Sequence, residues 1–290
     1  MITYIDRKTG KKEKEKVYGE AALKFLYGGS FIGSLLAFLA SRFFFVSWLY
    51  GFWQKRPWTR SKIQPFIQAY GVDPSEFVKQ PQDFTSFNDF FIRELKPESR
   101  PLSSTPLIIP ADARYLAYQT INEDKIIVKG QKFNLTELFG DEALAKRYAE
   151  GSLLMARLCP SDYHRFHFPT DCTPGESRLI NGFLYSVNPI ALDQRLSIFW
   201  ENKRKLTLLK TESFGEIAYF EVGATNVGTI IHTHQAFSPA KKGAEKGYFS
   251  FGGSALLLFF EPGKVKLSED LLAATAQGLE TRCLLGQPLI

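Results

Sequence analysis

After Leu107 the sequence becomes a series of short apolar runs separated by turn residues, and this series constrains the fold most. Runs of about four to eight apolar and β-branched residues bounded by turn signals predict strands. Pro-Gly pairs at 174–175 and 262–263 mark turns, and one or two helices are expected in the series, the clearest around Glu142 to Tyr148. The clearest runs are LIIP at Leu107, KIIVKG at Lys125, IAYFEVG at Ile217, VGTIIHTH at Val227 and ALLLFF at Ala255. We therefore expect a mostly β domain over residues 101–290.

The first 100 residues have a different pattern. A stretch of mixed charge from Arg7 to Lys16 predicts a solvated hairpin or helix, and 61–95 has a helical, amphipathic pattern. Asp73-Pro74 is typical of a helix start. A linker rich in proline and serine follows over 96–106. A helical N-terminal region before a mostly β domain is an α+β fold.

An apolar block runs from Phe25 to Trp53 and is interrupted by Arg42. A spanning helix needs about 20 apolar residues, and a span that included Arg42 would cost at least ~2.5 kcal/mol. The late start and the acidic residues before the block argue against a signal peptide. We expect two short helices in the membrane interface over about 25–53, with a buried helical hairpin as the alternative.

The composition is that of a folded chain with a basic surface. Of 290 residues, 44% are hydrophobic, enough for one large domain or two small ones, and the net charge is +6. A basic excess favours nucleic acid, anionic lipid or an acidic substrate as partner. The three cysteines are too widely spaced for a disulfide framework or a metal site, so we expect small buried hydrophobes: Cys159, Cys172 and Cys283.

All four histidines lie in two short clusters. His164 and His167 are three apart in DYHRFHFP, and His232 and His234 are two apart in HTH. Histidines at i and i+2 of a strand share a face and can share a metal. Neither cluster has an evident third ligand, so we expect no metal site. For His232 and His234 we favour strand residues with satisfied hydrogen bonds.

Ser254 follows two glycines and precedes an apolar strand. Glycine leaves the Gly253 carbonyl sterically open to attack by the neighbouring hydroxyl, which would convert the peptide bond into an ester. A histidine must take the hydroxyl proton, and a carboxylate must orient that histidine. His167 is the candidate base and Asp112 the candidate orienter. Alone, Gly-Gly-Ser is more commonly a plain turn.

Six motifs, taken in order, resemble the phosphatidylserine decarboxylase family over most of the chain. The Gly-Gly-Ser form is similar to a bacterial branch with glycine rather than leucine before the processing glycine. The motifs are FNDFFIRELKPESRP, PADA, CPSDYHRFHFP, LYSVNP, VGATNVGTI and KGAEKGYFSFGGSALLLFF.

The resemblance implies a zymogen that cuts itself between Gly253 and Ser254. Asp112, His167 and Ser254 would form the self-cleavage triad, and the ester at Ser254 would break by β-elimination. Hydrolysis would then release ammonia and leave a covalent pyruvoyl group at position 254. The products would be a β chain, 1–253, and an α chain, 254–290, which stay associated because the strand after Ser254 needs its backbone partners.

The same resemblance implies decarboxylation of phosphatidylserine to phosphatidylethanolamine and CO2, in phospholipid biosynthesis. The pyruvoyl ketone would form a Schiff base with the substrate amine and accept the electrons left by CO2. His164 is expected to protonate Cα, supported by Asp162 or Tyr163. Phe166 and Phe168 are candidates for the acyl entrance, with core packing as the alternative.

A lipid substrate would explain both the basic excess and the apolar block. Trp48, Trp53 and Trp58 suit headgroup depth, and nearby basic residues favour anionic lipid. We expect peripheral or monotopic attachment to the cytoplasmic side of the cell membrane, and no nucleic acid partner. A homodimer is an expectation from the family alone.

Three positions depart from the family pattern. Ala255 stands where threonine is frequent, Ala113 replaces a glycine after Asp112, and Lys203 replaces a frequent glutamate. Ala255 puts the cleavage rate in doubt and Ala113 puts the turn at Asp112 in doubt. Lys203 puts in doubt any carboxylate role at that position. None of them removes Asp112, His167 or Ser254, so we expect an active enzyme.

Three other functions compete with this one. A serine hydrolase could use the same Asp, His and Ser, although Ser254 lacks the G-x-S-x-G elbow. A non-catalytic lipid-binding protein would remain one chain. A related decarboxylase could act on another serine-bearing lipid or a soluble amino acid, and the apolar block argues against a soluble substrate.

Overall fold

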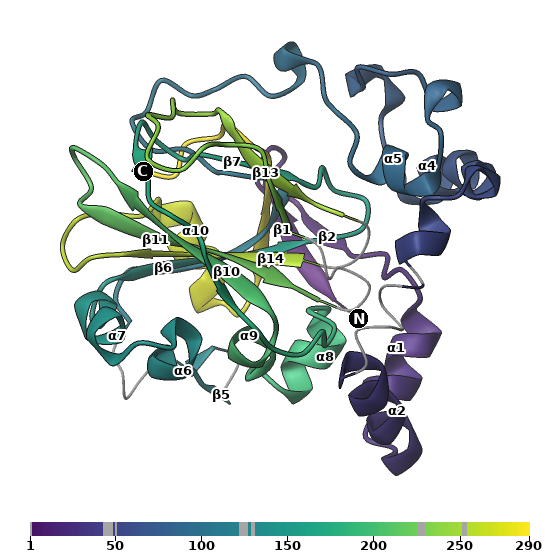
Figure 1. Cartoon of the computed structure of the whole chain (residues 1–290), viewed down its shortest axis with the longest axis horizontal. Coiled ribbons are helices and arrows are strands. Elements are labelled where there is room, and N and C mark those ends of the chain that lie inside the picture. Colours follow the sequence, from purple (N-terminus) through teal and green to yellow (C-terminus); the bar gives the residue numbers. More distant parts are fainter. Residues whose placement is uncertain are drawn as a thin grey trace.

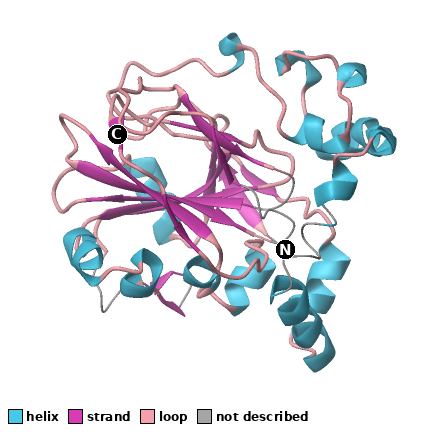
Figure 2. Ribbon diagram, in the orientation of Figure 1, coloured by secondary structure: helices cyan, strands magenta, loops and turns pink. Residues whose placement is uncertain are grey.

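The computed structural model describes residues 2–42, 49, 51–121, 127–128, 131–224, 230–250 and 254–290. Strands form the body of the molecule and short helices lie around it (Figure 2). The expected α+β class is confirmed in this coarse sense.

A ten-stranded sheet forms the centre of the fold (Figure 1). β14 lies between β6 and β11, and all seven of its residues are buried, as expected of a strand covered on both faces. In sheet order the strands are β2 (Lys12–Lys14), β1 (Thr3–Asp6), β15 (Glu280–Cys283), β3 (Ala113–Tyr118), β6 (Ser152–Leu158), β14 (Ser254–Phe260), β11 (Glu216–Gly223), β10 (Arg204–Lys210) and β8 (Thr173–Pro174), with β9 (Arg178–Ile180) also paired to β10.

A smaller sheet and one helix cover one face of the large sheet. The small sheet has the order β12 (Ile230–His232), β13 (Glu245–Phe249) and β7 (Arg165–His167), and the helix is α10 (Glu269–Ala276). Phe166 and Phe168 are buried there in the same apolar cluster as Leu256 and Leu258 of β14. These two phenylalanines are core residues, so the expected acyl entrance is wrong for them and the alternative of core packing holds.

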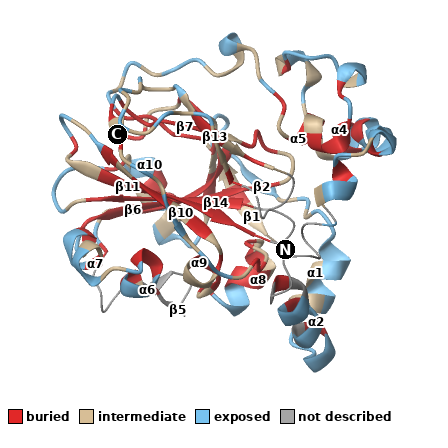
Figure 3. Cartoon of the chain, in the orientation of Figure 1, coloured by how far each residue is buried: buried red, intermediate tan, exposed pale blue. Residues whose placement is uncertain are grey.

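Four short helices cover the opposite face of the large sheet, and the strands between the two coverings are largely buried (Figure 3). The side chains of Asn134, Asp141 and Asn188 accept backbone N–H groups and so begin three of them. The helices are α6 (Leu135–Phe139), α7 (Glu142–Tyr148), α8 (Pro189–Gln194) and α9 (Ile198–Glu201), near the minor ribbon β4 (Ile127–Val128) and β5 (Gln131–Lys132).

The N-terminal region is not wholly helical. Its charged opening is the hairpin β1–β2, one of the two expected alternatives, and β1 pairs in parallel with β15. These residues therefore belong to the large sheet, although the sequence placed them in a helical region. The division at residue 100 otherwise stays a prediction.

Two helices follow the hairpin, α1 (Glu20–Tyr27) and α2 (Phe31–Arg42), and expose apolar side chains, which excludes the buried-hairpin alternative for them. Among the described residues, no single helix has both the length and the apolar composition to cross a bilayer; α1 and residues 31–39 reach that length and composition only together, as a pair bent by 102°. Residues 43–48 and 50, from the second half of the apolar block, lie outside the description. The exposed large side chains are Phe25, Phe31, Ile32, Leu35, Leu36, Phe38 and Leu39.

A separate cluster rich in phenylalanine follows α2 and lies to one side of the sheets (Figure 1). The predicted helix at Asp73-Pro74 is only a short 3-10 helix, which Asp73 caps. The helical elements are α4 (Ile63–Tyr70), α5 (Phe87–Phe91) and the 3-10 helices η1 (Pro57–Lys62), η2 (Pro74–Glu76), η3 (Pro81–Asp83) and η4 (Pro97–Ser99).

Candidate active site

Ser254 is the first residue of β14 and is fully buried. It lies opposite Leu158 of β6 and Gly223 of β11. Alternation along the strand puts its side chain on the face of Leu256, toward the small sheet. Among the described residues its Oγ has no hydrogen-bond partner. Gly253, the other half of the expected cleavage site, lies outside the description.

His167 ends β7 and is buried. Its Nδ1 lies 3.0 Å from the carbonyl oxygen of Gly243. A carbonyl only accepts, so Nδ1 carries the hydrogen and Nε2 keeps a lone pair. Nε2 is buried and has no partner among the described residues. Burial lowers the pKa of His167, so the ring is neutral near pH 7 and Nε2 can accept a proton.

Asp112 is buried but does not hydrogen-bond His167 in the described structure. Its carboxylate instead accepts from Arg100, at 3.0 Å from Nε and 2.6 Å from Nη2, and from the backbone N–H of Leu285. Its charge still acts through space, because it raises the pKa of His167 against the larger effect of burial. The expected contact between carboxylate and histidine is thus replaced by the Gly243 carbonyl.

His164 is fully buried beside α5, with the ring of Phe91 centred 3.8 Å from its own. Its Nδ1 lies 3.0 Å from the Asp162 carbonyl, so this nitrogen also carries the hydrogen. Nε2 has no partner in the described part of the chain. Burial lowers the pKa of His164 to about 3. His164 is therefore a neutral ring with an acceptor nitrogen.

The expected supports of His164 act differently from one another. Asp162 supports the ring through its backbone carbonyl, while its carboxylate binds Arg114 and the N–H of Cys159. Tyr163 is buried with its ring 5.8 Å from that of His167, so it lies beside the other histidine.

Backbone pairing links the histidine motif to the segment before Ser254. The N–H of Phe249, at the end of β13, donates to the His164 carbonyl at 3.0 Å. Only residues 250–253 separate Phe249 from Ser254, a reach of at most about 18 Å between Cα atoms. The backbone therefore limits how far the start of β14 can lie from the His164 carbonyl.

His232, from the second histidine cluster, belongs to a closed ring of five side chains that joins the two sheets. Lys246 donates to Glu221 and to Thr207, and Glu221 faces Nε2 of His232 at 3.2 Å. Ser177 closes the ring between Nδ1 of His232, at 3.1 Å, and Thr207, at 2.7 Å. We call these residues the closed ring.

His234 is also satisfied, because its Nδ1 lies 2.9 Å from the Lys246 carbonyl. The favoured interpretation of His232 and His234 is therefore confirmed, although the strand ends at His232. Among the described residues, no group of three histidines, cysteines or acidic residues could hold a metal. All three cysteines are free and buried, as predicted.

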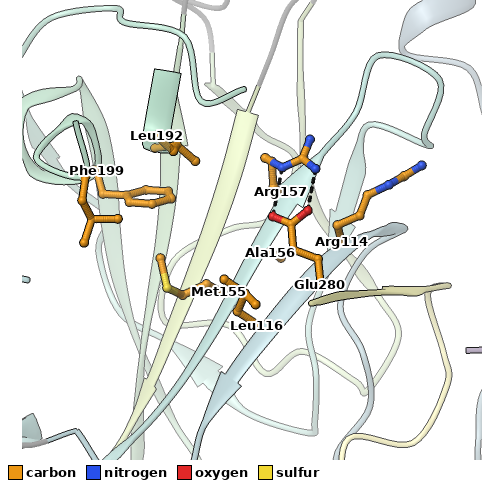
Figure 4. Close-up of a pocket in the computed structure, with 9 residues that line it drawn as sticks. Arg114, Leu116, Met155, Ala156, Arg157, Leu192, Phe199 and Glu280 are labelled. Carbon is orange, nitrogen blue, oxygen red and sulfur yellow. Dashed lines mark hydrogen bonds and ion pairs between the residues drawn. The ribbon is translucent and has the colours of Figure 1, made fainter. Parts of the chain in front are cut away.

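A small slot lies on the helical side of the large sheet, between the sheet and α8–α9 (Figure 4). Its cavity volume is about 20 Å³, room for about one water molecule. Arg157 at its rim is paired to Glu15 and Glu280, so it is not an unpaired anion site. The walls are mainly apolar: Leu116, Met155, Leu192, Leu196 and Phe199.

Two of the three departures have a structural context. Ala255 is fully buried in the apolar cluster beneath α6–α9, where a threonine hydroxyl would need a partner. Ala113 begins β3 and is fully buried, so no glycine turn is present there. Nothing in the structure assigns a role to position 203.

Sequence reasoning missed two arginines at the site. Arg100 binds the carboxylate of Asp112, and Arg93 binds the carbonyls of Ser161 and Asp162. Both lie inside the motif FNDFFIRELKPESRP, which was noted only for its resemblance. Arg93 stands in a run rich in phenylalanine, and this was the signal available in the sequence. An arginine in such a run is expected to be buried, and a buried arginine needs specific partners.

Comparison with known proteins gives a consistent result. The family model described as Phosphatidylserine decarboxylase matches residues 87–290. A phosphatidylserine decarboxylase proenzyme of Chlamydia caviae is 49% identical over 99% of this chain and 97% of its own. Proenzymes of the same name from Fusobacterium nucleatum and Clostridium tetani are 46% and 43% identical, over 99% and 100% of this chain and 96% and 98% of theirs.

Proposed function

This chain belongs to the phosphatidylserine decarboxylase family and is a carboxy-lyase, and we propose that it makes its own pyruvoyl group from Ser254. The supporting observation is the set of three buried polar atoms without partners among the described residues: Oγ of Ser254 and Nε2 of His164 and His167. Buried polar groups are normally paired, so a buried serine hydroxyl and two buried imidazole nitrogens without partners point to chemistry.

In the proposed self-cleavage, Ser254 and His167 divide the work. The Oγ of Ser254 attacks the Gly253 carbonyl and loses its proton to Nε2 of His167. The C–N bond then breaks, the Ser254 nitrogen takes a proton, and an ester remains. Gly243 holds the ring through Nδ1, and the charge of Asp112 favours the imidazolium that forms.

A pyruvoyl group at position 254 would supply the electron sink for loss of CO2. The start of β14 suits it, because Ser254 is buried among apolar strands and its Oγ has no hydrogen-bond partner in the described part of the chain. This chain's own contribution is to exclude water and to move protons.

His164 fits a proton carrier better than a permanent acid. Its ring is neutral, so Nε2 must receive a proton before it can give one. The substrate ammonium must lose one proton before its nitrogen can act as a nucleophile. We therefore assign His164 both steps: Nε2 takes that proton and later returns it to Cα, so the protons balance.

The two products of cleavage would stay together through the large sheet. The α chain, 254–290, supplies β14 in the middle of the sheet and β15 between β1 and β3. Separation would break the backbone ladders on both sides of each strand. Phosphatidylserine as substrate and a two-chain enzyme both accord with relatives named proenzymes.

We further propose that α1 and α2 contact the cytoplasmic side of the cell membrane. Phe31, at 83% exposure, and Ile32, at 63%, are side chains that water disfavours and a bilayer interface accepts. Replacing both with Ser should reduce sedimentation with vesicles containing phosphatidylglycerol and leave self-cleavage intact. Unchanged sedimentation would refute this contact.

The main test is intact-mass measurement on the full chain. We expect two chains, the smaller beginning with a ketone in place of an amine. Ser254→Ala should remain one chain and release no CO2 from phosphatidylserine. Cleavage of that variant, or decarboxylation by a chain whose residue 254 is still serine, would refute the proposal. A serine hydrolase would instead label with a fluorophosphonate as an intact chain.

A further inference from the structure

Arg93 is a buried cation with no carboxylate partner in the described part of the chain. It is 4% exposed, and its guanidinium hydrogen-bonds the carbonyls of Phe90, Ser161 and Asp162. Taking an unpaired charge out of water is costly. The rings of Phe77 and Phe90, 5.3 and 5.0 Å from its Cζ, offset only part of this cost. Such a residue needs a reason beyond stability.

The reason lies in an acceptor that Arg93 shares with His164. The carbonyl oxygen of Asp162 lies 3.0 Å from Nη2 of Arg93 and 3.0 Å from Nδ1 of His164. A carbonyl has two lone pairs, so it can accept from both. Phe91, two residues before Arg93, packs on the His164 ring. One short segment thus holds the imidazole both by its face and through its hydrogen-bond acceptor.

We infer that Arg93 is a positioning residue for His164: it fixes the Asp162 carbonyl, which holds Nδ1–H and leaves Nε2 as the unprotonated nitrogen. The inference deepens the proposed function and rests on the role given there to His164. It assigns Arg93 no contact with substrate.

The charges around His164 agree with this geometry. Burial is the main cause of its low pKa, and the positive charge of Arg93 acts in the same direction. The bond to the Asp162 carbonyl and the charge of Asp112 oppose them. Removing the guanidinium should therefore raise the pKa of His164 as well as loosen its ring.

Arg204 provides a matched control within the same chain. It too is buried and bonded to carbonyls, those of Glu137, Leu138, Trp200 and Asn202. Burial lowers the pKa of both arginines to about 10. The carbonyls of Arg204 belong to the ends of α6 and α9, so its loss removes a comparable buried cation without touching His164.

The first measurement needs neither cleavage nor turnover. In full-length chain carrying Ser254→Ala, 15N spectra of the imidazoles should show His164 neutral, with the hydrogen on Nδ1, down to strongly acidic pH. Adding Arg93→Gln should move its titration to higher pH and weaken the preference for Nδ1–H, whereas Arg204→Gln should change neither. An unchanged His164 in folded Arg93→Gln would overturn the inference even if the proposed decarboxylation holds.

The second measurement uses enzyme that has processed itself, made from a chain that keeps Ser254 in its sequence. Arg93→Lys keeps the charge but loses the planar fork, so kcat should fall on the order of 10- to 100-fold. KM should change little, and the acid limb of the pH profile should keep its place. In Arg93→Gln that limb should move to higher pH. Wild-type kcat in processed Arg93→Lys would overturn the inference, and this variant carries the test if Arg93→Gln does not fold.

Discussion

The molecule holds two clusters of histidines whose ring nitrogens are paired in different ways. In the closed ring every side-chain nitrogen and oxygen of His232, Glu221 and Ser177 that faces the ring has a partner. At the candidate active site, His164 and His167 each pair Nδ1 with a backbone carbonyl and leave Nε2 without a partner among the described residues.

The donors of the closed ring also have a consistent direction. Lys246 can only donate, so Thr207 accepts from it and donates to Ser177, which donates to Nδ1 of His232. Nε2–H of His232 then donates to Glu221, which also accepts from Lys246. A network satisfied in this way fastens one sheet to the other, whereas a histidine held at one nitrogen has its second nitrogen ready for a proton.

The largest effect should come from a substitution at the candidate active site, and it should appear in the rate of self-cleavage. His167→Asn can keep a donor toward the Gly243 carbonyl but removes the acceptor at Nε2. Loss of a general base typically costs about 10²- to 10⁴-fold. Self-cleavage, followed as the fraction of intact chain by mass spectrometry, should slow by that factor while the fold persists. His234→Asn is the control and should cleave at the wild-type rate. Equal slowing in both variants would refute the role of His167 as the base in self-cleavage.

The closed ring should respond in stability rather than in chemistry. Lys246→Met leaves Glu221 charged and buried without its cation, which should cost about 3–5 kcal/mol of the free energy of unfolding. Urea unfolding of the chain carrying Ser254→Ala measures this without interference from cleavage.

A double variant sharpens this result. Lys246→Met with Glu221→Leu removes both charges and should recover much of the lost stability. A single variant as stable as the parent would show that the ring does not fasten the sheets. A large fall in the rate of self-cleavage with unchanged stability would mean that the closed ring takes part in the chemistry and not in fastening the sheets.

Several elements could be predicted because their signal is local. The helix Glu142–Tyr148 has its cap and its pattern within a few residues, and β11 and β14 are mainly apolar runs. LIIP at Leu107 makes only an isolated bridge, because an apolar run does not reveal whether a neighbouring strand is available. The charged hairpin β1–β2 joined the large sheet through a partner about 275 residues away, which no local pattern reveals.

The candidate active site also has a part that the sequence indicated and a part that it did not. The motifs made Ser254, His164 and His167 the candidates because the proposed chemistry restricts the residue types that can serve there. The partners of the histidines are the carbonyls of Gly243 and Asp162, and backbone groups leave no mark on residue identity. The partner of Asp112 is Arg100, twelve residues earlier, where the sequence suggested only a linker.

The smallest expected effect is the pH dependence of stability that His164, at the candidate active site, contributes in acid. The pKa of His164 is about 3 in the folded chain, below its ordinary value of 6.5. Between these values the unfolded chain binds a proton that the folded chain refuses, so stability is full above 6.5 and declines as the pH falls toward 3. One such group contributes a slope of at most ~1.4 kcal/mol per pH unit.

The variant His164→Gln removes this group, so unfolding free energy should fall less steeply between pH 6.5 and 5 than in the parent, both carrying Ser254→Ala. Groups such as Glu221, whose pKa is lowered although burial opposes it, titrate alike in both chains and cancel in the difference. His234 is only half-buried, so His234→Gln should flatten the curve less. If the free energy of unfolding depended on pH in the same way in the parent and in His164→Gln, the folded chain would accept a proton on His164 freely. The His164 ring would then not be a neutral ring held at one nitrogen, and the contrast with the closed ring would fail.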